Sequence, residues 1–90
     1  MQRLDVSGLR PPAPILEIRR TLAGLPAGER LEVIGDDPDL IRDVPAYCAQ
    51  SEHRLIMVRP AGGATIVFEL AAGDANAESD AHALRLAQSA

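Results

Sequence analysis

Four short stretches of the chain alternate apolar with polar residues or are rich in β-branched residues, and two others repeat apolar residues with a helical period. The strand-like stretches cover residues 4–7, 29–34, 55–59 and 65–70. Runs of this length and composition predict β-strands. The last two strands flank the segment 60–63, whose proline and paired glycines predict a hairpin connection.

The first helical stretch runs from about residue 12 to about residue 25. Its apolar residues are spaced three or four apart and make one face, formed by Ile15, Ile18, Leu22 and Leu25. Pro12 and Pro14 fall in the first turn, where backbone N–H groups have no intrahelical partner to lose. Gly24 and Pro26 predict the end of this helix.

The second helical stretch carries two start signals. Asp36-Asp37-Pro38 predicts a capped turn, and Asp43-Val44-Pro45 follows at once. Because a proline inside a helix costs about 3 kcal/mol, we expect a brief turn over residues 38–42 and the main helix over about 44–51. The three aspartates Asp36, Asp37 and Asp43 are interpreted as caps rather than as acid–base catalysts. The inward face of this helix is expected to hold Val44, Tyr47, Cys48 and Ser51.

The predicted order of elements is β-α-β-α-β-β. This order favours an α/β (α+β) two-layer sandwich, with two helices on one face of a four-stranded mixed sheet. Residues 1–71 are expected to form this domain. Residues 72–90 change to an alanine-rich, polar composition, and for this tail a short helix and disorder both stay open.

Composition narrows the classes of function. All nine basic residues are arginines spread along the chain, and the net charge is −4. The chain therefore lacks the concentrated basic face of an autonomous nucleic-acid binder, and without lysine it cannot form a Schiff base. A single cysteine excludes an internal disulfide and a cysteine-cluster metal site. We expect a cytoplasmic protein with no membrane span, no metal and no cofactor.

One segment near the start of the chain carries the strongest functional signal. Gly8-Leu9-Arg10-Pro11-Pro12-Ala13-Pro14 would read G-L-R-C-P-A-P if Pro11 were a cysteine. Together with Asp36-Asp37-Pro38 and Arg42-Asp43-Val44-Pro45-Ala46-Tyr47-Cys48, this segment resembles the TusA/SirA/YedF family of small sulfur-carrier proteins. The resemblance runs from residue 4 to residue 70 and implies the same fold. It also implies that a cysteine at the position of Pro11 would carry a persulfide.

The motif formed by Gly8, Leu9, Pro11, Pro12 and Pro14 is therefore predicted to have lost its chemistry. Proline has no nucleophilic atom, and residues 8–20 hold no cysteine, serine or threonine. Cys48 is the one remaining sulfur acceptor, and its place on the inward face of a helix indicates an inert packing residue. His53 has no ligand or carboxylate at metal-site spacing and is interpreted as a structural hydrogen-bonding residue.

The resemblance implies protein partners in a sulfur relay: a cysteine desulfurase, a paralogous carrier or a downstream acceptor. We predict a non-catalytic binding or regulatory module, with Arg10, Arg19 and Arg20 as partner-binding candidates. Two alternatives stay open. One is a sulfurtransferase that uses Cys48, for tRNA thiolation or other sulfur metabolism, and the other is an oligomerisation or regulatory domain without a link to sulfur. A monomer and a weak homodimer both fit the pattern.

Overall fold

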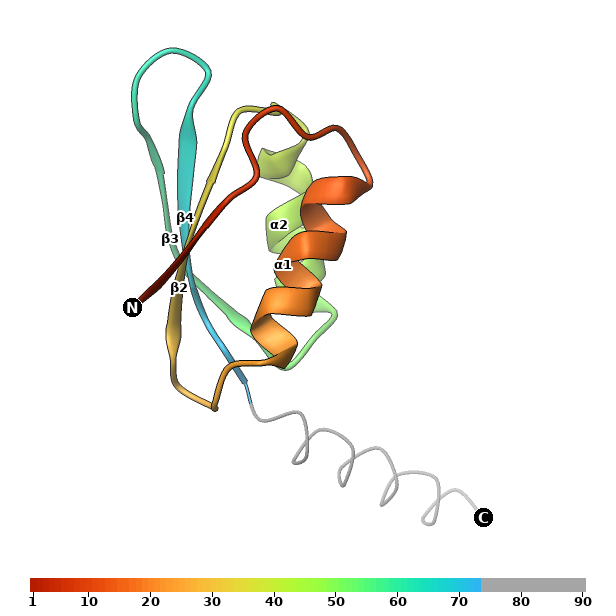
Figure 1. Ribbon diagram of the computed structural model, residues 1–90, viewed down its shortest axis with the longest axis vertical. Coiled ribbons are helices and arrows are strands. Elements are labelled where there is room, and N and C mark those ends of the chain that lie inside the picture. The colour runs from red at the N-terminus through yellow and green to blue at the C-terminus, as the bar shows by residue number, and fades with distance from the viewer. Residues whose placement is uncertain (74–90) are drawn as a thin grey trace.

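Six elements follow one another along residues 1–73, the part of the chain that the computed structural model describes (Figure 1). They are β1 (Gln2–Asp5), α1 (Ala13–Ala23), β2 (Arg30–Gly35), α2 (Leu40–Ala49), β3 (Arg54–Pro60) and β4 (Ile66–Ala71). Both helices cover the same face of the sheet. The predicted order β-α-β-α-β-β and the predicted two-layer α+β sandwich are confirmed.

The sheet is mixed, with the strand order β1-β2-β4-β3. β1 runs parallel to β2, while β4 runs antiparallel to both β2 and β3. The predicted hairpin joins β3 to β4: Ala61 N–H donates to the Thr65 carbonyl at 2.9 Å, and Gly62 and Gly63 take positive φ angles of 93° and 56°. Within residues 1–73, β1 and β3 are therefore the two edges of the sheet.

Aliphatic side chains and one phenylalanine fill the space between the sheet and the helices. The completely buried members are Val6, Ile18, Leu22, Leu31, Val33, Leu40, Val44, Phe68 and Leu70. Ile15 and Leu25 were both predicted on the inward face of the first helix and pack against this core while partly exposed, although Leu25 lies beyond the end of α1. This packing holds α1 beside α2 and brings the start of α1 next to the middle of α2.

Helix α2 is continuous, and the predicted break before residue 44 is wrong. The helix runs from Leu40 to Ala49 with Pro45 inside it. A proline at such a position costs about 3 kcal/mol. Leu40 and Val44 are completely buried beneath the helix, and each such side chain contributes about 1.5–3 kcal/mol. The free energy gained by burying both side chains therefore exceeds the cost of the proline. Ser51, which we expected on the same face, lies beyond the end of the helix.

The end of β4 is tied to the loop that precedes β2. Gly28 N–H donates to the Ala72 carbonyl at 2.8 Å, and Ala72 N–H donates to the Glu29 carbonyl at 2.9 Å. Ala72 is itself buried, so the packed part of the chain includes this first residue of the predicted tail. The prediction of a short helix or disorder for the tail concerns residues 74–90 above all, which lie outside the described residues.

Candidate functional site

The loop between β1 and α1 carries the proline-containing motif and is fixed by short-range hydrogen bonds. Ser7 N–H donates to Asp5 Oδ1 at 2.9 Å, and Leu9 N–H donates to the Val6 carbonyl at 3.2 Å. Hydrogen bonds from Ser7, through its side chain and then its backbone, hold the pKa of Asp5 below its usual value. Gly8 has a φ of 82°, which a residue with a side chain rarely adopts. The chain therefore turns sharply just before the motif.

A longer-range contact ties the same loop to the start of α2. Gly8 N–H donates to Asp36 Oδ1 at 3.0 Å, across 28 positions of sequence. Asp36 follows directly after β2, so this bond links the ends of the two parallel strands. We predicted Asp36 to be a helix cap, and that interpretation is wrong, because its carboxylate holds the motif loop instead.

The first turn of α1 contains few free N–H donors. Pro12 is the residue that precedes the helix and makes no side-chain cap, and Pro14 stands in the first turn as predicted. Ala13 N–H already donates to the Arg10 carbonyl at 2.9 Å. Pro11, Pro12 and Pro14 have no N–H at all. This helix start therefore offers little of the anion stabilisation that helix N-termini usually provide.

Pro11 and Pro12 are exposed and line a shallow groove of about 340 Å³ between the two helices. Ile15 adds to the same wall of the groove. The opposite wall is a stripe of α2 residues at the spacing of one helix face, formed by Asp43, Ala46, Tyr47 and Gln50. We call this space the inter-helix groove. It is mainly apolar, with one carboxylate and one amide at its rim.

The inter-helix groove continues towards the other end of the helices. A second hollow of about 350 Å³ shares Tyr47 and Gln50 with the first. Its other lining residues are Arg19, Ala23, Ser51, Glu52 and His53. Arg19 therefore lines this groove, and its role in binding a partner stays a prediction. Arg20 points elsewhere and pairs with Glu17 at 3.4 Å, and Arg10 is exposed in the motif loop.

His53 has a structural role at the far end of this groove. It is 7% exposed, and its Nδ1 accepts a hydrogen bond from Gly73 N–H at 2.9 Å. Its Nε2 lies 3.5 Å from Glu52 Oε1. The predicted structural hydrogen bond is therefore present, and it ties the end of β4 to the loop that follows α2. No group of three metal-ligating side chains occurs within residues 1–73, so His53 belongs to no such cluster there.

Cys48 lies away from the inter-helix groove. Its side chain is 6% exposed and packs in the core with Val44 and Leu40, as the helical period predicted. Burial raises the pKa of the Cys48 thiol above its ordinary value, because the apolar surroundings disfavour the thiolate. The thiol is therefore both hard to reach and a poor nucleophile.

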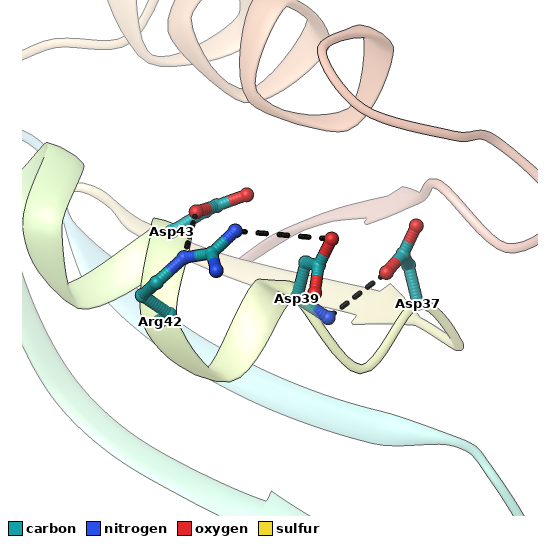
Figure 2. A network of polar contacts seen from close by, with 4 residues as sticks. All are labelled: Asp37, Asp39, Arg42 and Asp43. Atoms are coloured by element: carbon teal, nitrogen blue, oxygen red, sulfur yellow. Dashed lines mark hydrogen bonds and ion pairs between the residues drawn. The ribbon is translucent and has the colours of Figure 1, made fainter.

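The aspartates around the start of α2 have separate structural roles (Figure 2). Asp37 is buried, and its Oδ1 accepts a hydrogen bond from Asp39 N–H at 2.9 Å, which is the predicted capping geometry one turn before the helix. Asp43, also predicted to be a cap, instead accepts a hydrogen bond from Arg42 Nε at 3.0 Å from inside the helix. Arg42 also lies 3.8 Å from Asp39, and its pKa is raised, chiefly by the hydrogen bond to Asp43.

Asp36→Ala is expected to loosen the motif loop. The substitution removes the acceptor of Gly8 N–H, and a hydrogen bond of this kind contributes about 1 kcal/mol to the free energy of unfolding. Asp36→Asn keeps Oδ1 and should behave nearly as the native chain. Urea unfolding measures the stability, and hydrogen exchange of the Gly8 amide measures the local effect. Equal exchange of this amide in the two variants would contradict the assigned role.

Two comparisons place this fold and site among known proteins. The family model described as "Sulfurtransferase TusA" matches residues 2–70. The crystal structure of a SirA-like protein from Desulfitobacterium hafniense aligns with a TM-score of 0.72 at 20% identity, covering 82% of this chain and all of that one. The chain belongs to the TusA family. The structural match shows the shared fold, and neither α1 nor α2 is long and apolar enough to cross a membrane.

The sequence identified part of this site and missed the rest. Of the residues that it singled out, Pro11, Pro12 and Arg19 line the inter-helix groove. It missed Ala46 and Gln50, and it gave Asp43 and Tyr47 other roles. A signal for this wall was available, because residues 43, 46, 47 and 50 are spaced as one face of a helix. That stripe borders the inward face, and the break expected before residue 44 separated Asp43 from the rest of it.

Proposed function

We propose that this TusA-family chain does not carry persulfide and acts as a non-catalytic docking module for sulfur-relay proteins. The observation that carries the proposal is an exposed proline at residue 11 on the wall of the inter-helix groove, at the position that the resemblance assigns to the carrier cysteine. The groove supplies a contact surface, and the residue supplies no nucleophile. A surface of this kind can occupy a partner without taking sulfur from it.

The surrounding chemistry agrees with a loss of sulfur transfer. Proline at residue 11 brings neither a thiol nor an N–H group, so it can neither hold a persulfide nor help to stabilise a thiolate. Residues 8–20 contain no replacement nucleophile. Carriage by Cys48 would need its buried thiol to leave the core during every transfer. These observations favour binding over catalysis.

The apolar lining of the inter-helix groove, and two arginines beside it that form no ion pair with the described residues, support docking at this surface. Proline side chains form a rigid wall that loses little conformational entropy on binding. Arg10 and Arg19 flank the wall and form no ion pair within residues 1–73, so both can meet acidic side chains. TusA-family proteins generally interact with other sulfur-relay proteins. A cysteine desulfurase, a paralogous carrier and a downstream acceptor are the proposed partner classes, and a cytoplasmic location stays a prediction.

The proposal is tested by competition in a reconstituted sulfur relay. A cysteine desulfurase, cysteine and a carrier-competent TusA-family protein are incubated with increasing amounts of the native chain. We expect the chain to slow transfer to the carrier while its own intact mass stays unchanged. A gain of one sulfur that disappears in Cys48→Ala would instead establish Cys48 as the carrier. No effect on transfer would favour a role unrelated to sulfur.

Ala46→Arg should abolish the competition. Ala46 is an exposed residue of the groove wall, and a bulky cation there would block an approaching surface. Ala49→Arg is the matched control, because Ala49 is exposed on the same helix and lines neither hollow of the groove. We expect the apparent inhibition constant to rise at least about tenfold for Ala46→Arg, as for the loss of a central interface contact. Equal losses in both variants would place the contact elsewhere.

A further inference from the structure

β3 is an edge strand that extends beyond the helical layer. Among the described residues it pairs with β4 alone, and the β3–β4 hairpin runs past the ends of both helices (Figure 1). Val58 sits opposite the completely buried Phe68, yet it is 42% exposed. Ile56 and Met57 are exposed to a similar degree. Three consecutive apolar side chains therefore reach solvent at the edge of a sheet.

Two arginines flank this apolar stretch and have no carboxylate partner in the part of the chain that the structure describes. Arg54 and Arg59 form no ion pair within residues 1–73, and both are exposed. The arginines of the other sheet strands are neutralised, since Arg3 pairs with Glu32 at 2.9 Å and Arg30 pairs with Glu69 at 2.7 Å. Within the described residues, positive charge is thus left unpaired on a strand that also has a free edge.

The hydrogen-bond alternation of the hairpin shows which backbone groups face outwards. In an antiparallel ladder every second pair of facing residues is hydrogen-bonded. Ala61 N–H donates to the Thr65 carbonyl, so the next hydrogen-bonded pairs along the hairpin are Arg59 with Val67 and Met57 with Glu69. The N–H and C=O of Val58 therefore point away from β4. Pro60 occupies the next outward position and lacks an N–H, and a bulge at Ile56 interrupts the ladder on the other side. The free edge is short and centred on Val58.

A second copy of this chain fits the edge poorly. A two-fold antiparallel pairing through Val58 would set Arg59 of one copy opposite Met57 of the other. The two Arg59 side chains would then be diagonal neighbours, about 7–8 Å apart at their Cα atoms. Like charges at this spacing repel, and no described carboxylate of β3 compensates them. An occupant with acidic residues removes this repulsion and adds attraction.

We propose that the β3 edge binds an extended, apolar segment of a protein partner whose ends are acidic. The segment adds as a strand beside Val58, its apolar side chains cover Ile56, Met57 and Val58, and its carboxylates pair with Arg54 and Arg59. Main-chain hydrogen bonds provide the attachment, and the two arginines select for charge. This surface is separate from the inter-helix groove, so the proposed function does not depend on it.

The test uses the full-length chain, labelled with ¹⁵N, and a nine-residue peptide of alternating threonine and valine with glutamate at both ends. A peptide with lysine at both ends is the control. Titration should shift the amide resonances around Val58 and leave those of α1 and α2 in place. Arg54→Gln and Arg59→Gln should each weaken binding about two- to fivefold, as for exposed ion pairs. Arg20→Gln, an exposed arginine of α1, should leave it unchanged.

Preference for the glutamate peptide, shifts centred on β3 and loss of affinity in the two β3 variants would together support the proposal. Equal binding of both peptides would overturn it, as would shifts centred on the inter-helix groove or the absence of binding. Sedimentation of the chain alone gives an independent check. Self-association that Arg59→Gln strengthens and that shifts the Val58 amide would make a second copy the occupant and would also overturn it.

Discussion

Pro11→Cys is expected to accept about one sulfur atom per chain from a cysteine desulfurase, whereas the native chain accepts none. Residue 11 is exposed on the wall of the inter-helix groove, so a thiol there can reach a partner's persulfide. The substitution also restores a backbone N–H near the start of α1, which helps to stabilise a thiolate. The change would convert the proposed docking module into a carrier without altering the fold.

The measurement is intact mass after incubation with the desulfurase and cysteine, made in a Cys48→Ala background so that each chain has a single thiol. Pro12→Cys in the same background is the matched control. Residue 12 is also exposed and lines the same groove, but it lies one position beyond the one that the proposal assigns to the carrier cysteine. We expect the residue 11 variant to gain sulfur at least about tenfold faster, because misplacing a reacting atom by an ångström can cost a hundredfold. Equal rates would mean unspecific thiol exchange.

A folded Pro11→Cys variant that gains no sulfur would weaken the proposed function. It would indicate that the docking surface, and not only the cysteine, has diverged from that of the carriers. Asp43 is the residue to examine in that event, since its carboxylate lies on the same groove and disfavours a nearby thiolate. Arg42 donates a hydrogen bond to Asp43 at 3.0 Å and offsets part of that charge.

The fold could be predicted wherever the local sequence signals agreed with the tertiary packing. The spacing of Ile15, Ile18 and Leu22 matches the inward face of α1, and the glycines at 62 and 63 have the positive φ angles of the hairpin. α2 was misjudged because local propensity and packing disagree at Pro45. Burial of Leu40 and Val44 stabilises the helix by more than the proline destabilises it. The sequence alone does not show how deeply these side chains are buried.

The site was less predictable, because its features depend on segments that are distant in sequence. The bond between Gly8 and Asp36 requires that two parallel strands end side by side. The inter-helix groove requires the relative placement of α1 and α2. Val58 sits opposite the buried Phe68 because of the bulge at Ile56, and it is exposed because the helical layer ends before the hairpin does. The absence of a nucleophile at residue 11 could be predicted from the sequence, because a proline side chain has no nucleophilic atom in any fold.

Cys48 is expected to react with an alkylating reagent roughly a thousandfold more slowly in the native chain than in urea. Its side chain is 6% exposed, burial raises the pKa of its thiol, and thiolate is the reacting form. Reaction must then wait for the domain to open, which for a stability of about 5 kcal/mol happens in fewer than one molecule in a thousand. Cys48 is the one cysteine of the chain, so intact mass reports on it directly.

Val44→Ala identifies the opening that exposes Cys48. Val44 is completely buried one turn before Cys48, and truncating it should lower the free energy of unfolding by about 2 kcal/mol. If global opening controls the reaction, alkylation should become about 30-fold faster by the usual conversion of free energy into a ratio. Fast labelling of the native chain, unaffected by Val44→Ala, would contradict this. It would show that the end of α2 frays to present the thiol, and sulfur carriage by Cys48 would then become the better account of the protein.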